Sequence, residues 1–286
     1  MSQFFSVNNN ASASNILQNM YYVQNQINSS YQQLSSGNQI NSAADNPAGF
    51  AISQAMQQNV NGLNAAVQNA QNGISMIQTA TGAMQQVGDI LQTMNTLAVE
   101  ASNGTQNSAD LQNLQLEWTQ LSAQIDNISN QTQFNNIYLF TGNNGQNITA
   151  LSTNITLQIG ANYSQTITFS TSDISSIALG VSASGCTVGI STQNLAEAAI
   201  SAVSSAISAL SNYEAKLGSI QDELNYTISN LESTATNLQN ANATLTNTNM
   251  AQAYTTFTQE QVLSQVGTAM LSQAQQQPAS ILKLLS

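Results

Sequence analysis

The sequence predicts a mainly α protein, a long antiparallel helical rod or coiled coil made from both chain ends, with a small β-hairpin insert. Two observations lead to this fold class. Apolar residues recur in steps of three and four along residues 16–128 and again along 195–271, the spacing of helices that bury one face. Residues 131–192 between them are rich in Thr, Ile and Gly and contain short alternating runs typical of strands. The two helical ends can pair only if the chain folds back on itself.

The first two helices are marked by their apolar spacing and by the residues at their ends. The first helix carries a heptad seam made of Ile16, Met20, Val23, Ile27 and Leu34. Gly37 follows this seam as the expected C-cap. The second helix is expected to have Asn46 as its N-cap and Pro47 in its first position, where the missing N–H costs nothing. Its own seam runs from Val60 to Ala98.

Two further helices are expected to complete the core of the rod. After a polar loop, a third seam runs from Leu111 to Ile128, and a fourth helix extends from about Leu195 to Asn247, roughly 80 Å in length. Leucines repeat every seven residues along the fourth helix, and each one that is buried contributes about 1.5–3 kcal/mol. The predicted rod core comprises Trp118, Leu210, Leu217, Leu224, Leu231, Leu238 and Leu245.

The last helix and the insert give weaker signals. A Gln-rich helix is expected from about Met250 to Gln276, with Pro278 following its end. In the insert, Asn144-Gly145 is a hairpin-turn dipeptide. Residues 155–159 alternate in polarity and precede a segment, 160–164, that is suited to a turn. We therefore expect one or two β-hairpins at about residues 131–170.

The composition excludes most kinds of catalytic and ligand-binding site. Of 286 residues, 13 are acidic, two are basic (Lys216 and Lys283) and none is His, which leaves 5% charged residues and a formal charge of −11. Catalysis by Ser-His-Asp or Cys-His groups and metal binding by imidazole need His, and no Gly-rich phosphate-binding motif occurs. We expect no enzyme activity, no cofactor and no metal site. Nucleic-acid binding is excluded because it requires Lys and Arg. The single cysteine, Cys186, is expected to be a small, partly buried residue.

The N-terminal residues do not resemble a secretory signal. MSQFFSVNNNASASN has neither a basic region nor an apolar one, and no apolar run in the chain is long enough to span a bilayer. An anionic membrane surface would also repel a chain of this charge at neutral pH. We expect no cleaved signal peptide and no membrane insertion.

Several segments resemble bacterial flagellin, in the order that this family has them. They are LSSGNQINSAADNPAGFAIS (34–53), NAQNGISMIQTATGAMQQVGDILQTMNTLAVEASNGT (69–105), QTQFNNIYLFTG (131–142), LQIGAN (157–162) and VLSQVGTAMLSQAQQQPASILKLLS (262–286). The resemblance covers about residues 1–170 and 195–286. It departs from the family in charge, because neutral Gln39 and Ala44 stand where Arg or Lys is usual, and both arginines of the family stretch LQ-R-x-R-ELAV are missing from Leu91–Val99.

The resemblance implies a layered filament subunit. Residues 1–42 and 248–286 would form an inner coiled-coil domain, and residues 43–175 and 193–247 a helical rod domain with the β-hairpins at its edge. Residues 176–192 would be a short remnant in place of the outer domains of longer flagellins. The implied location is the extracellular filament of the flagellum, reached by export through the flagellar channel. The implied partners are other copies of the chain, the flagellar cap, the junction proteins and an export chaperone.

In flagellins the two chain ends are disordered in the monomer and fold on assembly. This agrees with polar terminal helices that carry only a narrow apolar stripe, since such helices are marginal until a partner buries them. The expected polymerisation contacts are Ile16, Met20, Val23, Ile27, Leu34, Val262, Val266, Met270 and Leu271. Two alternatives remain, a hook–filament junction protein, which shares the N-terminal architecture, and a heptad-rich secreted adhesin or translocator.

The missing basic residues lead to the hypothesis that the filament works in strong acid. Below about pH 3 carboxylates are protonated, and an ordinary flagellin would keep its bases without partners, so that packed subunits would repel one another. This chain would carry only the charges of Lys216, Lys283 and its N-terminus. Adaptation to high salt is the rival explanation, but it predicts abundant Asp and Glu.

Overall fold

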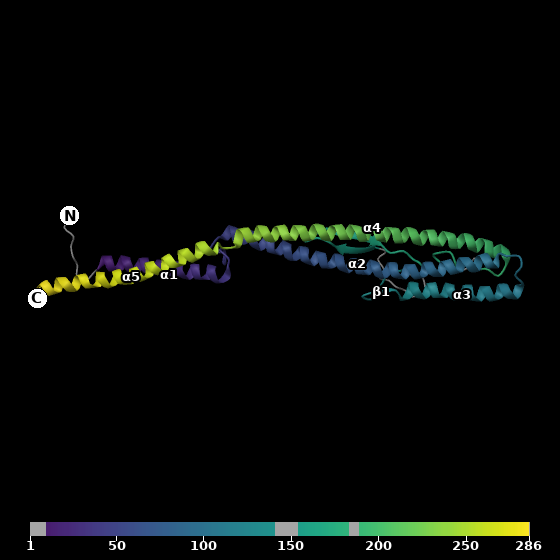
Figure 1. The fold of residues 1–286 in the computed structure, drawn as a ribbon, viewed down its shortest axis with the longest axis horizontal. Helices are drawn as coiled ribbons and strands as arrows, with labels where there is room; N and C mark the ends of the chain where they lie inside the picture. Colours follow the sequence, from purple (N-terminus) through teal and green to yellow (C-terminus); the bar gives the residue numbers. More distant parts are fainter. Residues whose placement is uncertain (1–9, 141–153, 183–188, 286) are drawn as a thin grey trace. The chain divides into compact units, whose positions relative to one another are not determined.

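The computed structural model describes residues 10–140, 154–182 and 189–285, the last nine of them by their backbone alone. Its helices are α1 (Ala11–Ser36), α2 (Pro47–Ala101), α3 (Ser108–Gln131), α4 (Gln193–Thr246) and α5 (Met250–Leu285). Its strands are β1 (Gln133–Phe134), β2 (Ile137–Tyr138), β3 (Asn154–Gln158) and β4 (Thr166–Ser170). The predicted fold class, mainly α with a small hairpin insert between the third and fourth helices, is confirmed (Figure 1).

The chain divides into two compact units. The terminal unit comprises residues 1–58 and 237–286, and the central unit comprises residues 59–236. These boundaries fall inside α2 and α4. The domain boundaries expected from the family resemblance, at 42/43 and 247/248, fall instead in the connections between helices.

In the terminal unit, α1 packs antiparallel against α5. Near the middle of the pair, a Cβ atom added to Gly267 would lie 3.0 Å from Cγ of Met20, so that the glycine allows a close approach of the two helices. At one end of the pair, the N–H of Gln39 donates to the carbonyl of Thr246 at 2.7 Å. The N–H of Thr248 donates in turn to the carbonyl of Gly37 at 2.9 Å. These bonds fasten the end of α1 to the start of α5.

The helix ends in this unit follow the capping rules. Gly37 has a left-handed backbone (φ 74°) and its N–H donates to the carbonyl of Gln33 at 2.9 Å, which confirms the predicted C-cap. At the start of α2, Oδ1 of Asn46 accepts a hydrogen bond of 2.9 Å from the N–H of Gly49. Asn46 therefore caps α2 and Pro47 is its first residue, as the sequence predicts.

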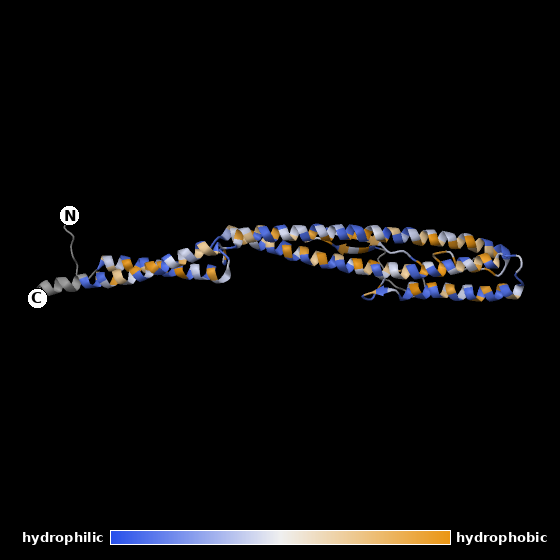
Figure 2. Ribbon diagram, in the orientation of Figure 1, coloured by the Kyte–Doolittle hydropathy of each residue, from blue (hydrophilic) through white to orange (hydrophobic). Residues whose placement is uncertain are grey.

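In the central unit, α2, α3 and α4 lie side by side, and β3 and β4 pack against α2 (Figure 1). The helices α2 and α4 are antiparallel, because Gly73 lies near Leu224 and Gly88 near Leu210. Apolar residues recur along both helices (Figure 2), and many of them are buried in one cluster together with residues of α3. This arrangement produces one continuous core, whose largest fully buried side chains include Ile77, Met84, Leu91, Met94, Trp118 and Ile125.

The insert contains two antiparallel hairpins among the described residues. The strands β1 and β2 are joined by Asn135 and Asn136, both with positive φ (51° and 64°), a conformation that Asn tolerates better than most residues. The longer hairpin pairs Asn154 with Ser170 through to Gln158 with Thr166, so the predicted turn at 160–164 is confirmed. The predicted turn at Asn144-Gly145 lies outside the described residues, as does Cys186.

The predicted end of the last helix is wrong. The helix α5 continues to Leu285, with Pro278 inside it. A proline within a helix removes the hydrogen bond to the carbonyl four residues earlier, here that of Ala274. In this chain the carbonyl of Ala274 accepts a hydrogen bond from the side chain of Asn10 instead. A side chain from the start of α1 thus replaces the lost backbone hydrogen bond, and the proline does not terminate the helix.

Candidate assembly surface

The helix α5 exposes an apolar face in the terminal unit. Val262, Val266 and Met270 follow one another at intervals of four residues, which places them on one side of the helix. Their exposed fractions are 56%, 51% and 52%. Leu271, the fourth residue predicted on this helix, is half-buried. Three of the predicted contact residues of α5 therefore stand free in the isolated chain.

The residues predicted on α1 are placed differently. Ile16, Met20, Val23, Ile27 and Leu34 are all half-buried. At least part of their cover comes from the same chain, since α1 packs on α5 and Met20 rests against Gly267. Met20 of the α1 seam thus packs on α5 within one molecule.

Other exposed side chains of α1 and α5 were missed by sequence reasoning. They are Leu17, Tyr21, Tyr22, Tyr31, Met250, Tyr254 and Leu263. Apolar spacing selects one stripe along each helix, and these residues lie outside the contact residues that it predicted. For the four tyrosines, aromatic character is the signal that could have identified them, because Tyr is enriched at protein interfaces.

The terminal unit contains very little charge. Asp45, Glu260 and Lys283 are its only charged side chains. The carboxylate of Asp45 accepts hydrogen bonds from the N–H groups of Ser42 (2.8 Å) and Asn41 (3.0 Å), and these bonds lower the pKa of Asp45. Glu260 is buried, and its Oε2 has no hydrogen-bond partner. Contacts between copies of this unit would therefore depend on apolar and neutral polar groups.

The predicted rod-core residues fall into two groups. Trp118, Leu210, Leu217, Leu224 and Leu231 are buried in the central unit. The indole N–H of Trp118 donates a 3.2 Å hydrogen bond to the carbonyl of Val181, so this residue also anchors the segment that precedes α4. Leu238 and Leu245 are half-buried and belong to the terminal unit.

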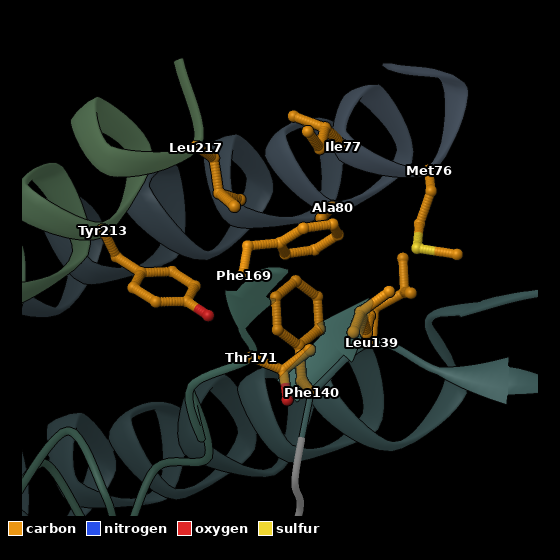
Figure 3. A pocket seen from close by; sticks show the side chains of 10 residues that line it. Met76, Ile77, Ala80, Leu139, Phe140, Phe169, Thr171, Tyr213 and Leu217 are labelled. Carbon is orange, nitrogen blue, oxygen red and sulfur yellow. The ribbon is translucent and has the colours of Figure 1, made fainter. Parts of the chain in front are cut away.

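A small apolar cavity of about 10 Å³ lies in the central unit between α2, the β3–β4 hairpin and α4 (Figure 3). The rings of Phe140 and Phe169 lie next to each other in its lining, and Ile77 and Leu217 line it from the helices (Figure 3). A space of this size holds about one water molecule at most. It is a packing gap, too small for a ligand or cofactor.

The described residues offer no other site of known chemistry. Over residues 10–140, 154–182 and 189–285, the structure brings together no cluster of His, Cys, Asp and Glu side chains that could bind a metal ion. In the same part of the chain, each helix is too polar or too short to cross a membrane. The exposed apolar residues of the terminal unit are thus the candidate functional surface.

Comparison with known proteins gives a consistent family assignment. Residues 7–145 match the bacterial flagellin N-terminal helical region, and residues 200–285 match the bacterial flagellin C-terminal helical region. The chain is 34% identical to flagellin FlaB1 of Treponema pallidum, and the match covers 98% of this chain and 99% of that protein. It is 38% identical to the flagellin of Bacillus subtilis, with the same coverage of 98% and 99%.

A solved structure agrees with these matches. The fold is similar to the crystal structure of Bacillus cereus flagellin, with a TM-score of 0.50 and 29% sequence identity. That similarity covers 61% of this chain and 94% of the solved chain. Matches at both ends of the chain and along nearly its whole length point to one family and do not favour a junction protein.

Proposed function

The chain belongs to the bacterial flagellin family, whose members are structural subunits of the flagellar filament, and on this premise we propose that its terminal unit supplies the contacts that build the polymer. The observation that carries this proposal is the exposed apolar face of α5, made by Val262, Val266 and Met270 in a unit almost without charge. Burying such a face between copies gains free energy with little cost of ion desolvation.

The two terminal helices have different roles in this proposal. The α1 residues Ile16, Met20, Val23, Ile27 and Leu34 hold α1 against α5. The α5 residues then form the surface that meets the next copy, and Leu271 at its edge contributes to both contacts. The exposed tyrosines of α1 enlarge the apolar surface that one copy offers to another.

A charge placed on the α5 face tests the proposal. Val266→Asp puts a carboxylate where the next subunit would bury it, and an unpaired buried charge costs several kcal/mol. We expect folded monomer and no filaments at pH 7, judged by electron microscopy after seeding. Gln265→Asp is the matched control, since it adds the same charge to the neighbouring exposed position on another side of the helix. Filaments from Val266→Asp at the wild-type concentration would refute the assignment of this face.

We propose further that the filament is adapted to an acidic medium. Lys216, the one base of the central unit, donates to the hydroxyl oxygen of Ser170 at 3.2 Å, a partner that does not ionise in acid. The neutral hydrogen bonds of the chain keep their strength when carboxylates are protonated, whereas ion pairs would be lost. Seeded assembly at pH 2.5 and pH 7 is the test. Filaments that persist at pH 2.5 support acid adaptation, and filaments at pH 7 alone refute it without affecting the proposed polymer.

The remaining partners follow from family membership. We propose that the flagellar cap and the junction proteins contact the same terminal unit, and that an export chaperone covers its exposed apolar face before export through the flagellar channel. Purification of the chain with each candidate is the test. Val266→Asp should weaken binding of a chaperone that covers this face, and Gln265→Asp should leave it unchanged.

A further inference from the structure

Tyr163 is fully exposed at the tip of the β3–β4 hairpin. Its exposed fraction is 100%, the highest of the exposed large side chains on the described residues. A single exposed aromatic residue needs no explanation by itself, because many surfaces carry one. Tyr163 differs from such residues because other side chains hold its loop in one conformation.

Two glutamines fix the backbone on both sides of Tyr163. Nε2 of Gln158 donates to the carbonyl of Gly160 at 2.8 Å and to the carbonyl of Asn162 at 2.7 Å. Oε1 of Gln165 accepts the N–H of Asn162 at 3.0 Å. Gln165 also lies directly over Gly160, where a Cβ atom would collide with its side chain. The loop is therefore held by hydrogen bonds from within the hairpin.

The same loop is anchored on α2. Nδ2 of Asn69 donates to the carbonyl of Gln158 at 3.1 Å. Ala161 rests on Gly62, where an added Cβ would lie 2.8 Å from the Cβ of Ala161. Ser164, next to Tyr163, has a left-handed backbone (φ 68°), which costs free energy for a residue other than glycine. Strain that the surrounding contacts maintain is a frequent mark of a functional position.

The geometry points to Tyr163 as a preformed contact that inserts into a neighbouring copy of this chain in the filament. This inference rests on the proposed function and adds to it a contact in the central unit. A rigid aromatic side chain loses little conformational entropy on binding, which favours it as an interface anchor. Residues 154–170 contain no charged side chain, so two copies can approach here without repulsion. Because the polymer is made of one chain, the surface that Tyr163 meets belongs to a second copy.

The test compares critical concentrations for polymerisation, measured by sedimentation at pH 7, of full-length variants. Tyr163→Ser should raise the critical concentration about tenfold or more, as expected for loss of an aromatic anchor. Its monomer should melt at the wild-type temperature, because a fully exposed side chain stabilises no intramolecular contact. Tyr226→Ser is the matched control, since Tyr226 is 80% exposed on the helix α4 and does not belong to the hairpin. It should polymerise like the wild type.

A second variant tests the positioning of the loop. Gly62→Ala forces Ala161 to move and should raise the critical concentration by a smaller factor, although Tyr163 is still present. An unchanged critical concentration for Tyr163→Ser would overturn the inference, and so would an equal rise for Tyr226→Ser. In either case, filaments formed by the wild-type chain would still support the proposed function. If wild-type chains with seeds form no filaments, the proposed function itself fails.

Discussion

The side-chain amide of Asn10 donates a hydrogen bond of 2.7 Å to the backbone carbonyl of Ala274. That carbonyl lacks its usual helical donor, because the residue four positions later is Pro278. The other atom of the same amide, Oδ1, accepts the N–H of Ala13 at 3.2 Å and caps α1. One side chain thus closes the start of α1 and replaces the bond that proline removes from α5.

This relationship predicts that Asn10 and Pro278 are energetically coupled. Asn10→Ala should cost about 1–2 kcal/mol of local stability, from the lost cap and from a carbonyl left without a donor. Asn10→Asp keeps the acceptor for Ala13 and removes the donor to Ala274, so that it isolates the second effect. In a Pro278→Ala background the helical N–H returns, and Asn10→Asp should then cost less. Because the chain ends are expected to fold on assembly, hydrogen exchange of α1 and α5 in assembled filaments measures these differences. Additive costs would exclude the coupling.

The heptad leucines of α4 should differ in their contribution to stability. Leu224 is fully buried in the core of the central unit, whereas Leu238 is half-buried in the terminal unit. Leu224→Ala should therefore lower the free energy of unfolding by about 2–5 kcal/mol, and Leu238→Ala by clearly less. Thermal unfolding followed by circular dichroism compares the two. Equal losses would show that the leucines of the seven-residue repeat contribute equally to the free energy of unfolding, whatever their burial.

Much of this fold could be predicted because its sequence signals are local. Apolar spacing identified all five helices, and Asn46, Pro47 and Gly37 marked the ends that the structure shows. Pro278 misled the prediction, since a rule about local sequence takes no account of a donor 264 residues away in the chain. The turn at Asn135-Asn136 was missed because neither residue is glycine, although Asn can adopt the required positive φ.

The candidate surface was harder to predict, because periodicity shows which side of a helix is apolar and does not show what covers it. On α1 the seam faces α5 of the same chain, while on α5 Val262, Val266 and Met270 remain exposed. Tyr163 offered no periodic signal at all. Its exposure depends on the glutamine bonds and the contact with Gly62 that only the folded hairpin brings together.

Glu260 should destabilise the terminal unit at neutral pH. Its side chain is buried in α5 and its Oε2 has no hydrogen-bond partner. Glu260→Gln replaces the carboxylate with a neutral group of nearly the same shape, which costs less to bury, so it should stabilise the α1 and α5 pair. Slower hydrogen exchange of α5 peptides in filaments of the variant is the expected result. Glu232→Gln, at an exposed position of α4, is the control and should have no such effect. Faster exchange in Glu260→Gln would indicate that the carboxylate is needed there.

Asp45 should make the segment 41–45 sensitive to acid. The N–H groups of Ser42 and Asn41 bond to its carboxylate and lower its pKa below the usual value. A lowered pKa in the folded state gives stability that is present above the unfolded value, near 3.8, and is lost as the pH falls through the folded value. Hydrogen exchange of this segment should be faster in Asp45→Asn than in the wild type at pH 6. The difference between the two proteins should shrink as the pH falls below 3.8 through the folded pKa of Asp45. A difference as large at pH 2.5 as at pH 6 would contradict the proposed cause.

Tyr213 should limit stability at the alkaline end. Burial raises the pKa of its phenol, whose O–H donates a 2.6 Å hydrogen bond to the carbonyl of Ser170. Because the unfolded chain releases this proton first, near pH 10, the stability that Tyr213 provides is complete below that pH. It is lost as the pH rises through the higher folded value. Tyr213→Phe should lower stability at pH 7 by about 1 kcal/mol, through loss of the hydrogen bond, and should reduce the decline above pH 10. Urea unfolding at pH 7 and pH 11 measures both effects. If stability falls above pH 10 as steeply in Tyr213→Phe as in the wild type, other tyrosines of the chain cause the fall.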